Sequence, residues 1–382
     1  MKILILASYP PTIISFRGEL IKLFLSKGHT VTIGAPFKQY SSSFRNELKK
    51  MNINTIDFPF FRTSLNPISF LKSLLFTIKI ITKLKPEYLF PYTITPVIIS
   101  GMTISLMKIL KINNEIKFFP LITGLGSVFT NKPLSLKENL IFKIIIYLYK
   151  ISLSKAKIIL FQNPDDIDYF LKKSVVKESQ NIRRVYGSGV NLMEYPFSNI
   201  PKKHIFLMVS RLLKDKGIYE YVNAAKKVLS ERSDAKFILI GDHDLNPSSI
   251  PKYEVEQWIE KGIIEHISFT NNVSEYLEKC RYFVLPSYRE GTPRSSLEAL
   301  SSGRPIITTN VAGCKETVID NYNGLLVPPK NSNELYLAMK KMISYKDREI
   351  KNMGTASRKI AEEVYDSRKV SLEYYEIIFH EK

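Results

Sequence analysis

The chain has 382 residues, more than one ordinary hydrophobic core accommodates, and its length therefore indicates two domains. With 45% hydrophobic and 24% charged residues, 16 glycines and 20 prolines, it has the composition of a soluble globular protein, which excludes disordered, collagenous and transmembrane classes. Only Cys280 and Cys314 are cysteines, which excludes a disulfide scaffold and a four-cysteine zinc site and indicates a reducing compartment.

The charge is strongly positive and unevenly distributed. The 55 basic and 36 acidic residues give a net charge of +19. Residues 1–190 contain 27 basic and 10 acidic side chains, a net +17, whereas residues 191–382 contain 28 and 26, a net +2. The N-terminal half therefore favours an anionic partner, such as a nucleic acid, an anionic membrane surface or a phosphorylated substrate.

The N-terminal residues predict a β-strand and no signal peptide. The apolar run Ile3 to Ala7 is too short for a signal sequence and ends in Tyr-Pro-Pro. Twenty uncharged residues between Glu87 and Lys108 are long enough to test as a membrane span. Their prolines, glycine, serines and threonines favour instead a strand, YLFPYT, followed by a helix that begins near Pro96.

Strand-like and helical patterns alternate along the rest of the chain. In the first half, a helix through residues 18–27 separates KILILAS from HTVTIGAP. The second half repeats this order, with a helix through residues 219–230 and the strand-like runs HIFLMVS, AKFILIGD, ISFT, RYFVLPS, RPIITTN and GLLVPP. This rhythm predicts two Rossmann-like α/β domains with parallel sheets, and the turn-rich segment 187–203 predicts their boundary.

The loops that follow parallel strands are the expected ligand-binding positions, and two of them carry suitable residues. After VLPS, Thr292 predicts an N-cap and Pro293 a first helical residue, so backbone amides would form an anion site there. Glu290 and Glu298 flank that helix start and could accept hydrogen bonds from sugar hydroxyls. After HIFLMVS, Arg211 and Lys216 could flank a diphosphate without a metal ion. Taken singly, each pattern is common in solvated loops and helices.

Together these segments resemble a known family. SYREGTPRSSLEALSSGRPIITTNVAGCKETVIDNYNGLLVPP resembles the donor-site motif of retaining glycosyltransferases of family 4. Similarity extends to RLLKDKG, to SFRGELIKLFLSKGHTV and to GSGVNLMEYP, and covers essentially the whole chain. The resemblance implies the GT-B fold, in which two Rossmann-like domains face each other across a cleft. The expected domains are residues 1–190 for the acceptor, residues 191–365 for the nucleotide sugar, and a helix at 366–382 returning to the first domain.

The resemblance also implies roles for the donor-side residues. Glu298 would bind the ribose hydroxyls, Glu290 would contact the donor sugar, and Arg211 and Lys216 would grip the diphosphate. Backbone around the helix start would contact sugar and phosphate, and the turn after ISFT would meet the base. These further donor-binding residues are Gly291, Thr292, Pro293, Arg294 and, after Asn272, Val273.

On the acceptor side, the sequence departs from the family pattern in two places. Many relatives have two adjacent glycines in the first loop, where this chain has Phe16, Arg17 and Gly18. Many also have a His-Gly pair after the strand corresponding to KFFPLI, where this chain has Thr123 and Gly124. We expect these residues and Gly126 to line the acceptor side, because small residues let a bulky substrate approach the backbone.

The implied activity is retaining transfer of a hexose or N-acetylhexosamine to an undecaprenyl-diphosphate-linked glycan, as in O-antigen or capsule biosynthesis. The first choice of donor is UDP-N-acetylgalactosamine or UDP-N-acetylglucosamine. Same-face substitution and a covalent intermediate both remain open, as does the oligomeric state. Asp242 and Asp244 imitate a metal-binding Asp-x-Asp motif, but the cationic pair already present leads us to expect no metal cofactor.

Two alternatives belong to other classes. A GT-B phosphorylase or nucleotide-sugar epimerase would share the fold but would need a phosphate nucleophile or act on the donor alone. A nucleic-acid-binding module would explain the basic half, but it predicts interleaved aromatic and basic residues, whereas the aromatic residues here are scattered through apolar runs.

Two lysine-rich helical segments predict membrane association. Lys72, Lys79 and Lys83 recur in one segment, and Lys143, Lys150 and Lys157 recur at seven-residue intervals in the other. Either segment can form a basic amphipathic helix on an anionic membrane surface. We therefore expect a cytoplasmic protein that lies peripherally on the inner face of the cell membrane, with lysines in water around an ordinary Rossmann helix as the alternative.

Overall fold

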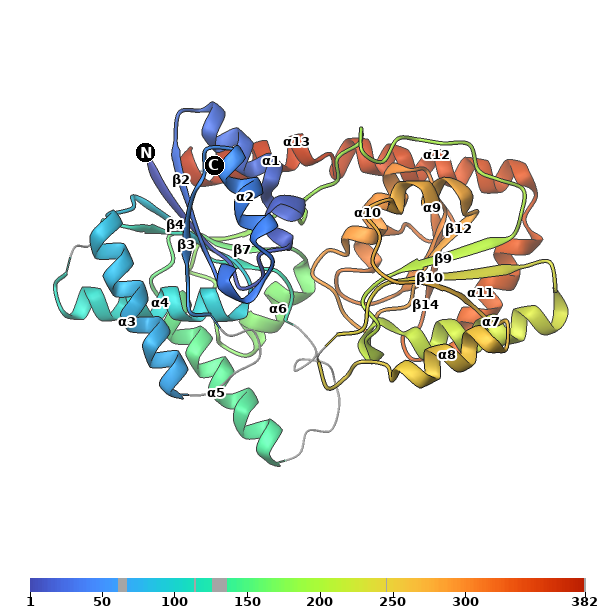
Figure 1. Cartoon of the computed structure of the whole chain (residues 1–382), viewed down its shortest axis with the longest axis horizontal. Coiled ribbons are helices and arrows are strands. Elements are labelled where there is room, and N and C mark those ends of the chain that lie inside the picture. Colours follow the sequence, from blue (N-terminus) through green and yellow to red (C-terminus); the bar gives the residue numbers. More distant parts are fainter. Residues whose placement is uncertain (61–66, 113–114, 126–135, 245, 381–382) are drawn as a thin grey trace. The chain divides into compact units, whose positions relative to one another are not determined.

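The chain divides into two compact units in the computed structural model (Figure 1), which describes residues 1–60, 67–112, 115–125, 136–244 and 246–380. One unit consists of residues 1–185 with 370–382, and the other of residues 186–369. The boundaries expected after residues 190 and 365 differ from these by five and four residues. Each unit has the alternating α/β organisation that the sequence predicts.

The N-terminal unit is built on two parallel sheets. The larger has the strand order β3-β2-β1-β4-β5, and the smaller has the order β6-β7-β8. Strand β1 is central and buried on both faces, which explains its continuous apolar run. The strands are β1 (Lys2–Leu6), β2 (Thr30–Ala35), β3 (Asn54–Asp57), β4 (Tyr88–Pro91), β5 (Lys117–Phe118), β6 (Leu121–Ile122), β7 (Ile159–Phe161) and β8 (Ile182–Arg184).

Helices connect these strands in the right order for a Rossmann-like unit. They are α1 (Thr12–Ser26), α2 (Ser42–Lys50), α3 (Pro67–Leu84), α4 (Ile94–Ile109), α5 (Leu136–Leu153) and α6 (Pro164–Lys172), with the 3-10 turn η1 (Phe37–Gln39). Asn163 caps α6, since its side chain accepts a hydrogen bond from the N–H of Asp166.

The C-terminal helix α13 (Ser367–Phe379) joins the N-terminal unit from residue 370 onward. Its aromatic side chains enter that unit's core: the ring of Phe379 stacks on His29 with 4.5 Å between centroids, and Tyr374 meets Phe90 edge-on at 6.0 Å. The expected return of the last helix to the N-terminal domain is thereby confirmed.

The uncharged stretch between Glu87 and Lys108 forms a strand and a helix, as expected. Strand β4 ends at Pro91, and α4 begins at Ile94, two residues before the predicted start at Pro96. Among the described residues, no helix combines the length and apolar character that a bilayer crossing requires.

The C-terminal unit has one six-stranded parallel sheet of order β11-β10-β9-β12-β13-β14. Its strands are β9 (Ile205–Val209), β10 (Lys236–Ile240), β11 (Glu265–Ile267), β12 (Tyr282–Leu285), β13 (Ile306–Thr309) and β14 (Gly324–Val327). Its helices and 3-10 turns are η3 (Lys214–Lys216), α7 (Ile218–Glu231), α8 (Lys252–Glu260), α9 (Val273–Lys279), α10 (Arg294–Ser301), η4 (Lys315–Thr317), α11 (Ser332–Ser344) and α12 (Asp347–Val364).

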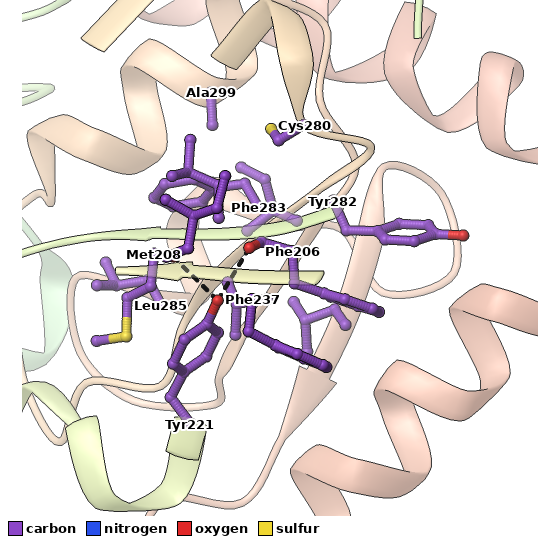
Figure 2. Close-up of a cluster of buried hydrophobic side chains, with 14 of the residues drawn as sticks. Phe206, Met208, Tyr221, Phe237, Cys280, Tyr282, Phe283, Leu285 and Ala299 are labelled. Carbon is purple, nitrogen blue, oxygen red and sulfur yellow. Dashed lines mark hydrogen bonds between the residues drawn. The ribbon is translucent and has the colours of Figure 1, made fainter. Parts of the chain in front are cut away.

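The core of this unit fixes the central strands, from whose ends the functional loops depart. Figure 2 shows Tyr221 of α7 below the sheet, with its hydroxyl donating to the carbonyls of Phe206 and Ile238 at 2.9 and 3.1 Å. Around it, Phe206 stacks on Phe237 and on Tyr282. This packing ties β9 to β10 and β12 and so holds the carboxyl ends of neighbouring strands in place.

Several predicted boundaries are wrong by a few residues. Helix α1 begins at Thr12 and not near Gly18, and β11 ends at Ile267, before most of ISFT. Helix α5 ends at Leu153, so Lys157 does not continue the heptad of Lys143 and Lys150. The N–H of Lys157 instead donates to the carbonyl of Phe118 at 2.8 Å, because the chain there is already turning into β7.

Candidate active site

The candidate donor site lies at the carboxyl ends of β9, β12 and β13, which are neighbours in the C-terminal sheet. Because parallel strands end at the same edge, the loops that follow them meet there. The predicted residues Arg211, Lys216 and Glu290 belong to two of these loops, and the β13 loop packs behind them.

The loop after β9 presents the two predicted cations. Arg211 is exposed, and its guanidinium lies 2.6 Å from a carboxylate oxygen of Asp244. Lys216 is the last residue of η3, followed by Gly217 in the left-handed conformation at φ 75°. A side chain at Gly217 would collide with the carbonyl of Pro286, so this glycine lets the β9 and β12 loops approach closely.

Glu290, in the loop after β12, links the two loops directly. One of its oxygens, Oε1, lies 2.6 Å from Nζ of Lys216 and accepts a hydrogen bond of 2.7 Å from the hydroxyl of Ser287. Both members of the ion pair are largely shielded from solvent. The carboxylate therefore fixes the position of the ammonium group in an environment where charge interactions are stronger than in water.

The backbone around Glu290 is supported by the loop after β13. The N–H of Glu290 donates to the carbonyl of Ala312 at 2.9 Å, and Gly313 follows with φ 82°. A Cβ on Gly313 would collide with the carbonyls of Glu290 and Gly291. The Glu290 loop therefore adopts this geometry only with glycine at position 313.

Helix α10 begins at Arg294, one residue later than the sequence predicts. Pro293 occupies the N-cap position with extended backbone, and Thr292 is not the N-cap. The first intrahelical bond comes from the N–H of Ser296, so the positive end of the helix dipole lies at Arg294 and Ser295. Gly187 belongs to the linker motif GSGVN. A Cβ at this position would collide with the side chain of Thr292.

Glu298 is buried, only 7% exposed, on the inner side of α10. Its Oε1 accepts a hydrogen bond of 2.9 Å from Nε of Arg294, one helical turn earlier. Burial raises the pKa of this carboxyl above its usual value, while Arg294 and a hydrogen bond from the Tyr195 hydroxyl oppose the rise. Glu298 and Glu290 thus have separate sets of partners.

The sequence did not indicate the contacts that hold the predicted residues in place, including the ion pair of Arg211 with Asp244, a residue singled out only for its Asp-x-Asp motif. Ser287 lies two residues after the end of β12 and begins the donor-site motif, but nothing in the sequence marks it as a partner of Glu290. Tyr195, near Glu298, and Asp244, which pairs with Arg211, come from distant parts of the chain. Tyr288 donates a 2.7 Å hydrogen bond to Glu220 and anchors the β12 loop on α7.

The predicted base-binding turn and the Asp-x-Asp motif are also in this unit. Val273 is half-buried and begins α9. Asp244 pairs with Arg211, and Asp242 accepts a hydrogen bond of 2.9 Å from the N–H of Phe269. Within the described part of the chain, no group of three or more histidine, cysteine, aspartate or glutamate side chains could hold a metal ion.

The acceptor-side residues lie in the N-terminal unit. Phe16, Arg17 and Gly18 are on α1, whereas Thr123 and Gly124 follow β6. Arg17 is only 3% exposed, and its guanidinium lies 5.3 and 5.5 Å from the ring centroids of Tyr92 and Tyr374. Arg17 therefore helps to attach α13 to this unit, and Gly126 lies outside the described residues.

Two family models match the chain, one in each half. "Glycosyl transferase 4-like" matches residues 2–163, and "Glycosyl transferases group 1" matches residues 191–360, which contain the whole donor site described above. The chain is a glycosyltransferase.

Two curated relatives of this glycosyltransferase have names that specify substrates linked to undecaprenyl diphosphate. It is 29% identical over 351 residues to the N,N'-diacetylbacillosaminyl-diphospho-undecaprenol alpha-1,3-N-acetylgalactosaminyltransferase of Campylobacter jejuni, covering 88% of this chain and 87% of that protein. An Escherichia coli UDP-Gal:alpha-D-GlcNAc-diphosphoundecaprenol alpha-1,3-galactosyltransferase is 30% identical over 125 residues, 31% of this chain and 32% of the relative.

Solved structures establish the fold of the glycosyltransferase. Sucrose-phosphate synthase from Thermosynechococcus elongatus superposes with a TM-score of 0.77 at 17% identity, over 100% of both chains. HepE from Anabaena, in complex with UDP and glucose, superposes with a TM-score of 0.76 at 15% identity, over 98% of both chains. The fold is GT-B, as the sequence predicts.

The buried carboxyl of Glu298 makes the stability of the glycosyltransferase depend on pH. Because folding raises its pKa, the native state binds a proton more tightly than the unfolded state. Stability therefore falls as the pH rises from the pKa of Glu298 in the unfolded state to its higher pKa in the native state. The Glu298→Gln variant replaces the carboxyl group with an amide that has nearly the same shape and carries no charge at any pH. We expect its melting temperature to exceed that of the wild type at pH 8, with the difference becoming smaller as the pH is lowered and Glu298 of the wild type is protonated.

The chain contains a matched control for this measurement. Arg358 and Glu362 form an ion pair with the same i,i+4 spacing and order, but Glu362 is half exposed. Glu362→Gln is expected to leave the pH dependence of the melting temperature unchanged. A Glu298→Gln variant whose melting curve follows the wild type at every pH would contradict a burial penalty at this site.

Proposed function

We propose that the enzyme is a retaining glycosyltransferase that moves a hexose or N-acetylhexosamine from a UDP-sugar to a glycan carried on undecaprenyl diphosphate. The observation that carries this proposal is the similarity to the Campylobacter jejuni enzyme, which extends over 88% of the chain and so includes both the donor and the acceptor unit. UDP-N-acetylgalactosamine is the first donor to test, followed by UDP-N-acetylglucosamine. The biosynthetic setting would be an O-antigen, a capsule or a related surface glycan.

In this proposal the C-terminal unit binds the donor. Arg211 and Lys216 hold the diphosphate, and the N-terminal end of α10 supplies backbone amides around Thr292, Pro293 and Arg294. Glu290, already in contact with Lys216, receives sugar hydroxyls, and Glu298 receives the ribose hydroxyls. Gly291 lets the sugar approach the backbone, and Val273 lies beside the base. The UDP complexes of HepE support a nucleotide in a fold of this type.

Retention follows from substitution on one face of the sugar. The bond between the anomeric carbon and the diphosphate oxygen breaks, and the acceptor oxygen bonds to that carbon from the same side. The acceptor proton passes to the departing diphosphate, whose charge Lys216 and Arg211 stabilise. A double displacement through a covalent intermediate is the other route to retention. No step in either route requires a metal ion.

The N-terminal unit would hold the acceptor. Phe16, Thr123 and Gly124 offer an exposed aromatic ring and partly exposed small residues to a lipid-linked glycan, whereas Gly18 is buried on α1 and would not contact the acceptor. Arg17, packed between Tyr92 and Tyr374, would keep α1 in place on that side. A lipid-linked acceptor requires the enzyme to work at a membrane surface, peripherally on the cytoplasmic face of the cell membrane.

A donor screen tests the proposal without knowledge of the acceptor. Purified enzyme is mixed with UDP-, GDP- and ADP-sugars, and thermal stabilisation and slow release of the nucleoside diphosphate are measured. We expect one UDP-N-acetylhexosamine to raise the melting temperature and to be hydrolysed slowly. Turnover that requires added phosphate would identify a phosphorylase, and conversion of the free donor into a second sugar nucleotide would identify an epimerase. Either result would overturn the proposal.

A further inference from the structure

Helix α3 of the N-terminal unit exposes an apolar face. Ile68, Leu71 and Leu75 recur at intervals of three and four residues, so they lie on one side of the helix. Each is between 53% and 66% exposed. Single exposed apolar residues are common on protein surfaces. Three on one helix face form a contiguous patch, which is typical of an interaction surface.

Helix α5 repeats the arrangement. Leu140, Ile144 and Tyr147 again recur at intervals of four and three residues, and they are between 47% and 63% exposed. Tyrosine is favoured where one part of a side chain is in apolar surroundings and its hydroxyl is in water. We call these two faces, Ile68-Leu71-Leu75 and Leu140-Ile144-Tyr147, the apolar stripes.

The apolar stripes lie on helix faces other than those that pack in the interior of the unit. On α3, Leu74 is buried, and Ile80 and Ile81 are buried in a cluster with side chains of β1 and β4. On α5, Ile145 and Tyr149 are buried. Both helices therefore have apolar residues on the side that packs and on the side that faces solvent. An ordinary Rossmann helix needs only the first of these.

Lysines stand on the same exposed sides. Lys72, Lys79 and Lys83 accompany the stripe of α3, and Lys143 and Lys150 accompany that of α5. No acidic residue occurs between Asp57 and Glu87, and no ion pair joins these five lysines to a carboxylate within the described residues. Beside α5, a shallow hollow of about 500 Å³ is lined by Lys150, Lys172 and Lys177, with Glu178 as its acidic member.

The two helices belong to one side of the unit. Helix α4 packs against both α3 and α5. Phe70, in the first turns of α3, also contacts the cluster of buried side chains that contains Ile145 and Tyr149 of α5. Figure 1 shows the N-terminal parts of α3 and α5, which carry all of the apolar stripe of α3 and Leu140 and Ile144 of that of α5, along the lower edge of this unit.

We infer that the exposed faces of α3 and α5 insert into the surface of an anionic lipid bilayer. The apolar stripes would enter the boundary between headgroups and acyl chains, and the lysines would contact anionic headgroups. Charge decides between a bilayer and a second copy of the chain, because two copies would bring the same unpaired lysines together. The inference rests on the proposed function in one respect: a lipid-linked acceptor presents its diphosphate at that same interface.

Vesicle flotation tests the inference directly. Wild-type enzyme is expected to bind phosphatidylglycerol vesicles, to bind phosphatidylcholine vesicles at least tenfold more weakly, and to be released from the former by salt. The triple variant Ile68→Ser, Leu71→Ser, Leu75→Ser should lose about tenfold or more in affinity even at low salt. The triple variant Lys72→Gln, Lys79→Gln, Lys83→Gln should lose roughly a hundredfold.

Exposed residues of the C-terminal unit supply matched controls. Tyr253, Ile259 and Leu337 are also exposed apolar residues on helices, and Lys226, Lys261 and Lys351 are exposed lysines. Serine at the first three and glutamine at the second three should leave vesicle binding within about twofold of the wild type. Hydrolysis of the UDP-sugar, measured without vesicles, should be the same in every variant. It reports on the donor site, so a failure of the proposed function is visible separately.

Three outcomes would overturn the inference. One is equal binding to charged and uncharged vesicles, and another is equal loss of binding in the α3 variants and the controls. The third is sedimentation of the wild type as an oligomer that the serine variant converts to a monomer, with vesicle binding unchanged. That result would assign the apolar stripes to an interface between copies of the chain.

Discussion

The Lys216→Ala variant is expected to lose about 10²- to 10³-fold in kcat with the fold intact. Lys216 supplies a shielded positive charge whose position Glu290 fixes at 2.6 Å, and charge on the departing diphosphate develops only as the glycosidic bond breaks. Removing one preorganised electrostatic group of this kind typically has an effect of that size. The change should appear mainly in kcat, with a smaller change in KM, because the interaction strengthens in the transition state.

Lys214 provides the matched control for this prediction. It lies in the same 3-10 turn two residues earlier, but its side chain is exposed. Lys214→Ala should keep kcat within about twofold of the wild type, since an exposed lysine contributes little to the charge at the site. Equal activity of the Lys216→Ala and wild-type enzymes would remove Lys216 from the mechanism.

The Gly313→Ala variant is expected to damage activity and stability together. Its added Cβ would collide with the carbonyls of Glu290 and Gly291, and alanine is disfavoured at φ 82°. The Glu290 loop must move to relieve the collision, which separates the carboxylate from Lys216. We expect a loss of at least about 100-fold in kcat/KM, as displacements of about 1 Å can produce, and a loss of about 1–3 kcal/mol in stability.

Gly262→Ala separates the two causes. Gly262 also has a left-handed conformation, at φ 64°, but a Cβ there would meet no atom within 4 Å. This variant should lose about 1 kcal/mol of stability and keep full activity. If Gly313→Ala behaves like Gly262→Ala in both assays, the geometry of the Glu290 loop does not depend on close backbone packing.

The fold was predictable because its signals are local. The continuous apolar run of β1 and the alternation of such runs with helical segments follow from a parallel sheet covered on both faces. The predicted helix boundaries were less accurate. Helix α10 begins after Pro293, whose backbone is extended, and α5 ends before Lys157. Those ends depend on how the chain meets neighbouring strands, which residue preferences alone do not encode.

The candidate site was predictable where its residues are close in sequence. Glu290, Glu298 and the start of α10 lie within one segment, and Lys216 follows a strand in a recognisable motif. The contacts that hold them come from elsewhere: Ser287 on Glu290, Tyr195 near Glu298, and Asp244 on Arg211. Only the folded sheet brings these partners together. The apolar stripes were overlooked for a similar reason, since exposure cannot be read from hydropathy.

The stereochemistry of transfer tests the proposed activity directly. The enzyme is incubated with a UDP-N-acetylhexosamine and an undecaprenyl-diphosphate-linked N-acetylhexosamine, and the anomeric configuration of the new linkage is determined by NMR. We predict a product lengthened by one sugar, with the same anomeric configuration as the donor. A product of inverted configuration, or no transfer from any sugar nucleotide to this acceptor, would contradict the proposed function.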